Sequence, residues 1–327
     1  MLSDRKAAIL QAVVEGYIST SEPVGSTHVV STSGLDVSSA TVRTEMAALE
    51  EDGYLQQPHT SAGRVPSEKG YRYFVDSLME PRTLGRSQQQ KVSSFFRTAQ
   101  GELELMLQQT SGMLARMTDY AAVVVGPPAE VSPVRGIQAV RLADDQALLV
   151  AVHANASIER RVVAIEPETT DDDLDAASRR LIAVHVDRRD DPGSAQAREN
   201  TVFATLSEAL AVPDESPVFV GGASTVAGSF EAVEQVQEIL TVLEKQYLVV
   251  TLVSDILERG MEVAIGSETG MQPLSECSLV VAPVEVDGVQ AGSIGLLGPT
   301  RMHYAEAMAT VAYVSQQLGG VLREGTS

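Results

Sequence analysis

The sequence has few of the cysteine and histidine residues that disulfide-bonded and metal-binding proteins need. Among its 327 residues there is one cysteine, Cys277, and no tryptophan. A single cysteine excludes an intramolecular disulfide, fits a reducing compartment and falls short of the cysteine sets of common structural zinc sites. The histidines follow no metal-ligand spacing. They are His28, His59, His153, His185 and His303. We therefore expect neither a metal site nor a cofactor.

Long apolar runs are missing too. The longest, near residues 248–253 and 279–284, fall well short of the ~20 residues that a membrane helix needs. A signal peptide has an uncharged apolar stretch soon after its start, but this sequence has the charged residues Asp4, Arg5 and Lys6 there. The sequence therefore predicts a soluble, cytoplasmic protein without a membrane partner.

Basic residues are scarce. Lysine and arginine number 24 against 44 acidic residues, so the formal net charge is -20. This charge argues against a protein that coats nucleic acid nonspecifically, but it leaves room for a reader of nucleic acid that has one local basic surface.

What is present favours several folded domains. A length of 327 residues is about twice that of a usual domain, so two or three domains are expected. A hydrophobic content of 44% excludes a disordered chain. The block of residues 1–80 contains 6 basic and 11 acidic residues and is therefore net -5. The net charge of this block does not indicate its function, so the function must be inferred from the residue pattern.

The pattern of this block is helix, turn, helix, two-stranded wing, helix, the order of a winged helix-turn-helix. Ser38 or Ser39 can cap the second helix of the turn. This helix buries Val42, Met46 and Leu49, spaced as one helical face. Small residues on its outward face permit close approach to a DNA groove, and its arginine and hydroxyl groups suit base edges and phosphates. The candidate DNA-binding residues here are Ser39, Thr41, Arg43 and Thr44. Residues 50–52 are acidic, so we expect the helix to enter the groove by its N-terminus.

The predicted wing has strands at residues 54–57 and 64–66 and a loop at residues 58–63. The segment 59–74 has three cations against one acid and suits a sugar-phosphate backbone. Its candidate residues are His59, Thr60, Ser61, Arg64, Lys69 and Arg72. The alternative for the whole block is a protein–protein module whose basic residues form a solvated face.

The rest of the chain predicts mixed α and β structure. After a linker at residues 81–87, a helix over residues 88–118 carries an apolar stripe that is either core or a dimer interface. The charge-rich segment 166–217 looks like a separate small helical unit. Further strands are expected at residues 121–125, 134–142, 147–153, 158–165, 218–220, 261–265, 278–284 and 290–297, and a closing helix at residues 304–322.

No catalytic constellation is evident. GSIGLLG, residues 292–298, departs from the dinucleotide-binding fingerprint, and glycines in a strand with close backbone approach explain it equally well. Cys277 lies beside apolar residues and is expected to be a buried thiol. We therefore expect no enzyme activity.

Four segments together resemble the HrcA family of heat-inducible transcription repressors. They are VSSATVRTEMAALEEDGYLQQPHTSAGRVPSEKGYRYFVD (residues 37–76), FVGGAS (219–224), ECSLVVAP (276–283) and GLLGPTRMHY (295–304). The resemblance implies an α+β multidomain fold: an N-terminal winged helix-turn-helix at residues 1–80, a GAF-like α/β domain at 81–166 and 218–327, and an inserted small helical dimerising domain at 167–217. Thr44 stands where the family is expected to have asparagine.

The resemblance also implies a function. It predicts a homodimer that binds an inverted-repeat operator in double-stranded DNA upstream of chaperone operons and is kept active by the GroEL chaperonin. The alternative is a small-molecule-responsive regulator that uses the GAF-like domain as its sensor. For the dimer interface, two segments are candidates: the insert, which the resemblance favours, and the apolar stripe of residues 88–118.

Overall fold

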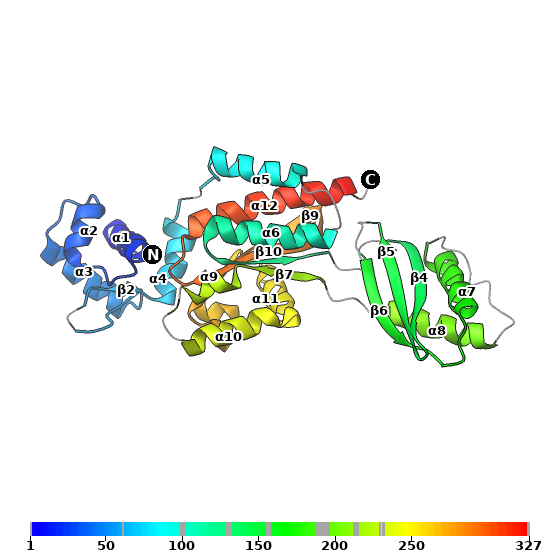
Figure 1. Cartoon of the computed structure of the whole chain (residues 1–327). Helices are drawn as coiled ribbons and strands as arrows, with labels where there is room; N and C mark the ends of the chain where they lie inside the picture. Colours follow the sequence, from blue (N-terminus) through cyan, green and yellow to red (C-terminus); the bar gives the residue numbers. More distant parts are fainter. Residues whose placement is uncertain are drawn as a thin grey trace.

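Three parts of the chain lie in a row. The N-terminal part is at one end, a central sheet flanked by helices is in the middle, and a second sheet with its own helices is at the other end (Figure 1). The structure, a computed structural model, describes residues 2–60, 62–80, 82–98, 103–127, 133–154, 158–186, 197–211, 216–228, 230 and 233–325. Ser61, a candidate DNA-binding residue, lies outside them. No helix in these ranges is long and apolar enough to cross a membrane.

The N-terminal part has the predicted order of elements. They are α1 (Asp4–Thr20), α2 (Ser26–Thr32), α3 (Ser39–Glu51), β1 (Leu55–Gln56), β2 (Val65–Pro66), α4 (Glu68–Tyr73) and a π-helical turn (Phe74–Leu78). Gly34 adopts a left-handed conformation (φ +65°) just after α2, which fits the predicted cap. Apolar residues of α1, α3 and β1 form the core, which explains their spacing in the sequence.

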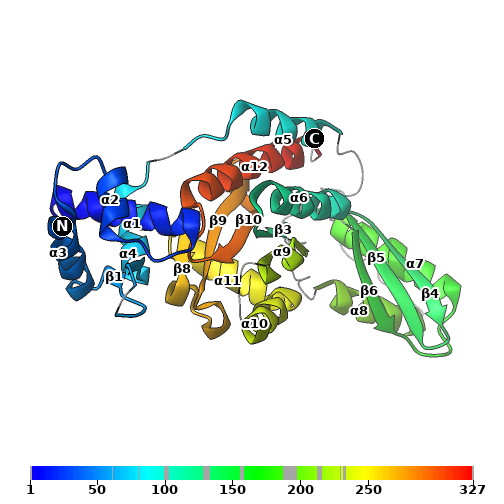
Figure 2. The ribbon, with the colours of Figure 1, turned by 60° about the vertical axis from the view of Figure 1, so that its left-hand side comes forward.

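The central part is an antiparallel sheet between two helical layers (Figure 2). Its strand order is β7-β3-β10-β9-β8. The strands are β3 (Ala121–Val125), β7 (Val218–Gly221), β8 (Val263–Ile265), β9 (Cys277–Val286) and β10 (Val289–Pro299). Alternate residues of one strand serve opposite layers, so Val123 packs with Ile239 while Val124 packs on the side of Val311. Because both faces are covered, these strands are apolar almost throughout.

The helices around this sheet correct one prediction. They are α5 (Arg86–Thr98), α6 (Leu103–Thr118), α9 (Ala223–Ala227), α10 (Val233–Glu244), α11 (Gln246–Glu258) and α12 (Tyr304–Gly325). The single helix expected over residues 88–118 is wrong, because α5 packs on α12 whereas α6 packs on β3 and β7. Val92, Phe96 and Met113 of the stripe are buried within the chain, which confirms the core interpretation.

The third part differs from the expected insert. It contains a three-stranded sheet, β4 (Val134–Ala143), β5 (Gln146–His153) and β6 (Ile158–Ala164), with α7 (Asp171–Leu181), a π-helical turn (Ile182–Val186) and α8 (Ala197–Ala211). The expectation divided the chain at residue 166 and assigned these strands to the GAF-like domain. Instead, Ala139, Leu149 and Val163 share a separate core with Leu174 and Leu206. Because the strands and helices share this core, they form one sheet-and-helix unit.

Candidate nucleic-acid interface

The helix α3 is capped at its N-terminus and free on one face. The Ser38 hydroxyl accepts a hydrogen bond from the Thr41 backbone N–H at 3.1 Å, so Ser38 is the N-cap. Val42, Met46 and Leu49 are buried, as predicted. The opposite face is open to solvent and presents Arg43 and Thr44.

Three candidate hydroxyls of α3 have partners within the chain. The half-buried Ser39 shares a 2.8 Å hydrogen bond with Ser26 at the start of α2, so it joins the two helices of the turn. The hydroxyls of Thr41 and Ser38 lie 2.9 Å apart. Thr44 donates to the Ala40 carbonyl at 3.2 Å and remains exposed. Of these hydroxyls, that of Thr44 is the most accessible to a ligand.

Arg43 is unusual among the N-terminal cations. In residues 2–60 and 62–80 it is the only lysine or arginine whose side chain forms no ion pair or hydrogen bond with the described chain. Its side chain is exposed on the middle of the free face. An exposed guanidinium without an intramolecular partner is available to a base edge or phosphate.

The wing beside α3 is a short antiparallel ribbon with a braced loop. The Gln57 side-chain amide donates to the carbonyls of Thr60 and Ala62 at 3.1 and 3.0 Å. His59 and Thr60 are exposed at the tip. Gln57 therefore holds the Thr60 and Ala62 carbonyls, while the side chains of His59 and Thr60 face solvent.

The return strand of the wing passes close to the chain that precedes α2. Val24 and Arg64 exchange two backbone hydrogen bonds of 2.9 Å. A Cβ on Gly63 would lie 2.4 Å from the Val24 carbonyl oxygen. Glycine is therefore required at this crossing, and the wing is anchored to the helix-turn-helix.

Two predicted wing cations already have partners at the end of α3. The Arg64 guanidinium lies 2.8 Å from the Glu50 carboxylate and is only 16% exposed. The Lys69 ammonium donates to the Asp52 carbonyl at 2.7 Å and lies 4.3 Å from the centre of the Tyr54 ring. Both cations stabilise the fold, and only Lys69 is exposed.

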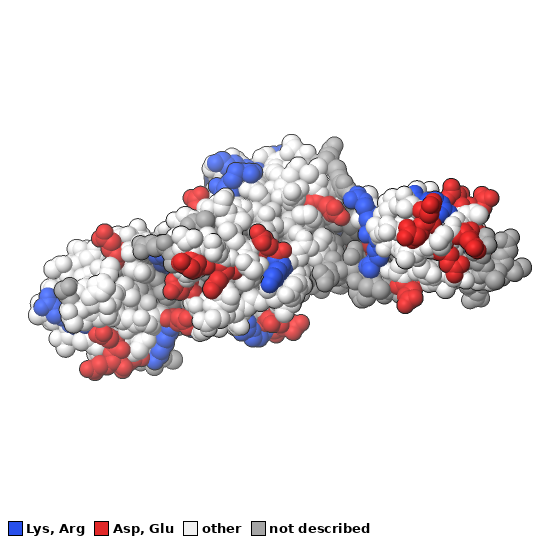
Figure 3. Space-filling view, turned by 60° about the horizontal axis from the view of Figure 1, so that its bottom comes forward, with Lys and Arg blue, Asp and Glu red and all other residues white. Residues whose placement is uncertain are grey.

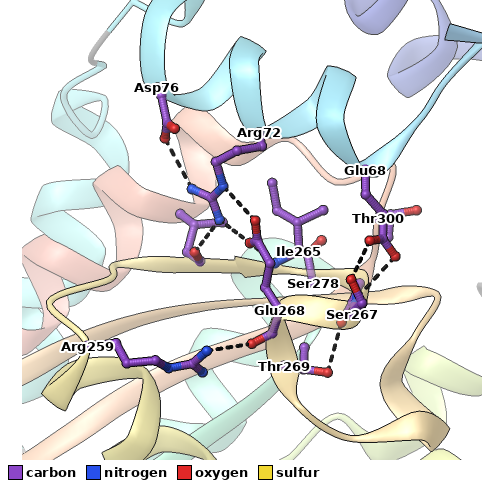
Figure 4. Close-up of polar contacts among 12 residues, drawn as sticks. Glu68, Arg72, Asp76, Arg259, Ile265, Ser267, Glu268, Thr269, Ser278 and Thr300 are labelled. Carbon is purple, nitrogen blue, oxygen red and sulfur yellow. Dashed lines mark hydrogen bonds and ion pairs between the residues drawn. The ribbon is translucent and has the colours of Figure 1, made fainter. Parts of the chain in front are cut away.

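Arg72 differs from its predicted role as a phosphate contact. It lies on α4 and donates to Glu268 through two nitrogens, one at 2.9 Å, and to the Val263 carbonyl at 2.7 Å (Figure 4). It also pairs with Asp76 at 3.1 Å. These bonds turn the guanidinium toward the central sheet, so Arg72 joins two parts of the chain instead of facing DNA.

The acidic end of α3 is partly neutralised by α1. Lys6 donates to Asp52 at 2.8 Å, and this hydrogen bond lowers the pKa of the Asp52 carboxyl. Arg5 lies 3.6 Å from Glu45. On the face shown in Figure 3, the basic side chains of the described residues are scattered among acidic ones. The described residues on this face therefore form no broad basic surface.

Other chemistry considered from the sequence finds no site in the described residues. They contain no group of histidine, cysteine and acidic side chains that can hold a metal ion. Burial raises the pKa of the Cys277 thiol to about 12. Residues 292–298 lie within β10, where a Cβ on Gly292 would approach the Val125 carbonyl oxygen to 2.4 Å. The interpretations as a buried thiol and as strand glycines are confirmed.

Comparisons with known proteins place the chain in a family. The sequence profile of the HrcA protein C terminal domain matches residues 104–308. The chain is 36% identical to the heat-inducible transcription repressor HrcA of Pelotomaculum thermopropionicum, over 98% of this chain and 97% of that protein. The chain belongs to the HrcA family. The HrcA of Carboxydothermus hydrogenoformans is 35% identical, over 98% of both chains.

A solved structure shares this fold over the whole chain. A crystal structure described as a hypothetical protein matches with a TM-score of 0.64 at 20% identity, over 99% of this chain and 100% of that one. The HrcA profile runs from α6 into α12 and so includes the sheet-and-helix unit.

The sequence did not predict the contact between the N-terminal part and the central sheet. Arg72 and Glu268 are 196 positions apart in the HrcA chain, and neither lies in a motif that points to the other. A charged pair of this kind leaves no local signal in one sequence, since both residues suit an exposed turn or helix.

Proposed function

We propose that this protein is a transcription repressor of heat-shock chaperone operons and that α3 is the helix that reads its operator. Arg43 carries the proposal: it is exposed on the free face of a capped helix and has no partner within the described chain. The order α2, turn, α3, two-stranded wing supports a winged helix-turn-helix. Family membership supports the repressor function, since the relatives are named heat-inducible transcription repressors.

The contacts follow from the geometry of α3. Its N-terminus enters the major groove, where small Ala40 and Ala47 permit close approach and Arg43 binds a base edge. The hydroxyls of Thr41 and Thr44 bond phosphates or bases. The wing-tip residues His59 and Thr60, and the cation Lys69 of α4, lie along the sugar-phosphate backbone, and Ser61 remains a candidate there from the sequence alone. Arg64 contacts phosphate only when it leaves Glu50.

A homodimer that binds an inverted repeat completes the proposal. The sheet-and-helix unit dimerises through the face of its sheet that α7 and α8 leave uncovered. Val140, Leu148 and Val162 are cross-strand neighbours on this face, and Val140 and Val162 are 47% and 61% exposed. A row of exposed apolar side chains on one sheet face is typical of an interaction surface.

The GroEL chaperonin keeps the repressor active in this proposal. In the central sheet, β3 pairs with β7, and the whole sheet-and-helix unit lies between these two strands in the sequence. The ribosome must therefore synthesise that unit before the two strands can pair. Such long-range pairing in a chain of several parts slows folding and exposes intermediates that a chaperonin can bind.

Footprinting on the promoters of chaperone genes tests the function. The wild-type protein should protect an inverted repeat, and Arg43→Ala should lose most of this protection. Arg116→Ala, an exposed arginine of α6 far from α3, serves as the control. Equal protection by wild type and Arg43→Ala would contradict the role of α3, and protection of no promoter by wild type would contradict the function.

The small-molecule sensor is less well supported. The apolar cavity between the central sheet and helices α10 and α11 measures about 10 Å³ and is lined by residues such as Val123, Leu252 and Leu297. About one water molecule fills such a volume. A sensor ligand would have to bind elsewhere or open this core.

A further inference from the structure

The N-terminal part is joined to the central sheet by a contact with fixed geometry, which we call the α4–sheet contact and which consists of Glu68, Arg72, Ser267 and Glu268 (Figure 4). The Glu68 carboxylate accepts from the Ser267 backbone N–H at 3.0 Å and from its hydroxyl at 2.5 Å. Gly266 has φ +55°, and a Cβ there would lie 2.2 Å from the Glu68 carboxylate. Glycine therefore lets this carboxylate approach.

Arg72 fixes the orientation of α4 relative to the central sheet. Its planar guanidinium is held by Glu268, by the Val263 carbonyl and by Asp76, so it has acceptors on three sides. Glu268 is fixed in turn, because it accepts from the Ile265 backbone N–H at 2.9 Å. A guanidinium that is bound by two atoms of one carboxylate and by a carbonyl has one orientation.

A buried aromatic contact lies close to these charges. The rings of Tyr71 on α4 and Tyr304 on α12 have centroids 6.1 Å apart, and the two residues are 3% and 1% exposed. Burial raises the pKa of both phenols. Apolar packing therefore supplies attraction, whereas the ion pairs determine the relative orientation of the two parts.

The contact continues to α3. The Ser67 hydroxyl, which caps α4, donates to the Gly53 carbonyl at 2.6 Å, and Lys69 donates to the Asp52 carbonyl at 2.7 Å. A Cβ on Gly70 would lie 2.2 Å from the Tyr54 carbonyl oxygen, so α4 and the chain after α3 are in close contact. The position of α3 relative to the central sheet thus depends on α4.

The geometry points to Arg72 and Glu268 as positioning residues that determine which operator half-site spacing the dimer accepts. This inference rests on the proposed function. In a dimer, the two copies of α3 reach two half-sites only at the separation that the connection between each reading part and the dimer allows. With a stiff connection, the second copy of α3 has a high effective concentration at its half-site for one spacing and a low effective concentration for other spacings. With a loose connection, this effective concentration depends less on the spacing.

The test is a spacing series on the operator found by footprinting. Fluorescent duplexes carry the native spacing, spacings changed by one or two base pairs, and a spacing changed by about five base pairs, which is half a helical turn. A single half-site duplex measures binding without spacing. The proteins are full-length wild type, Arg72→Ala, Glu268→Gln and the double variant, with Arg116→Ala as the control. Glu268→Gln keeps an oxygen for the Ile265 backbone N–H.

Wild type and the control should lose on the order of 100-fold in affinity at the half-turn change, because one half-site is then out of reach. Arg72→Ala and Glu268→Gln should lose less than about tenfold there relative to their own best spacing. Single half-site binding should stay within about twofold of wild type, because α3 itself is unchanged. The double variant should be no flatter than either single one, since the two residues act through one contact.

Two results would overturn the inference. A spacing profile of both variants that matches wild type would show that the contact does not set the spacing. Parallel losses on every duplex, single half-site included, would mean that Arg72 binds DNA or holds the fold. Arg72→Lys, which keeps the charge without the planar fork, replaces Arg72→Ala if the latter does not fold, and it should also flatten the profile. If wild type binds no operator, the proposed function fails first.

Discussion

The Arg64 guanidinium lies 2.8 Å from the Glu50 carboxylate, so a cation of the wing is joined to the end of α3. In the proposed DNA complex, phosphates compete with Glu50 for this guanidinium. Glu50→Gln should therefore raise the affinity for any DNA several-fold and steepen the salt dependence of binding by about one unit, because one more cation displaces a counterion. Fluorescence anisotropy at several salt concentrations measures both quantities.

Glu51→Gln is the matched control for this prediction. It removes the same charge from an exposed neighbouring position but leaves the Arg64 pair intact. Equal salt slopes for the two variants would show that Arg64 stays on the protein when DNA binds.

Arg43→Ala should cost about 1–3 kcal/mol of operator affinity and relax specificity at one base pair of each half-site. The free energy of unfolding should change by less than about 0.5 kcal/mol, since the side chain is exposed and unpaired. Competition binding with operator and random duplexes measures the loss. An equal loss on both would make Arg43 a phosphate anchor.

Gly70→Ala should destabilise the N-terminal part although alanine favours helix. Helix propensity alone would stabilise the protein by about 1 kcal/mol. The new Cβ, however, would lie 2.2 Å from the Tyr54 carbonyl oxygen, and overpacking of this kind costs about 1–3 kcal/mol. Urea unfolding measures the sum, which we expect to be a loss.

Gly112→Ala gives the comparison with opposite sign. It lies inside α6, where the nearest described atom outside the helix backbone to the new Cβ is the tip of the Arg116 side chain at 3.4 Å. This variant should gain stability by up to about 1 kcal/mol. A loss at Gly112, or a gain at Gly70, would contradict the packing argument.

If the proposed dimer forms through the uncovered sheet face, Val140→Asp combined with Val162→Asp should convert it to a monomer. Two carboxylates placed on the uncovered sheet face would have to be desolvated in an interface built on it. Sedimentation velocity measures the oligomeric state. Val289→Asp, which changes a 58% exposed valine of the central sheet, should leave the dimer intact. A dimeric double variant would place the interface on another surface.

Cys277 should report the folded state that, in the proposed function, the chaperonin maintains. With its pKa raised to about 12, only about one thiol in 10⁴ is ionised near pH 8, and the side chain is fully buried. A thiol reagent should therefore label the native protein very slowly and the unfolded protein at once. After heating, labelling should rise as operator binding falls, and chaperonin with ATP should reverse both. Labelling that rises without loss of binding would contradict the coupling.

Much of the fold was predictable because its signals are local. The buried face of α3, the glycine after α2 and the apolar strands of the central sheet each follow from spacing within a few residues. The sequence did not predict that β4, β5 and β6 belong to the third part, because an apolar strand has the same pattern whichever sheet it joins. Likewise, a helix break after α5 leaves the apolar stripe nearly unchanged.

The site divides in the same way. The exposed position of Arg43 follows from the helical period that buries Val42 and Met46. The partners of Arg64 and Arg72 depend on tertiary placement, which brings Glu50 and Glu268 to them from different elements. The sequence of a wing-like segment therefore shows its basic residues but not which of them an acid of the fold already holds.

The chain leaves and re-enters the central sheet at a single point. Val125 of β3 pairs with Val218 of β7, and the Gly126 backbone N–H donates to the Pro217 carbonyl at 2.8 Å. The two ends of the sheet-and-helix unit are thus adjacent, and the unit has a core of its own. Replacing everything between these two residues by a tight turn would leave an ordinary β-hairpin. The unit is therefore interchangeable: evolution or design can exchange it without altering the N-terminal part.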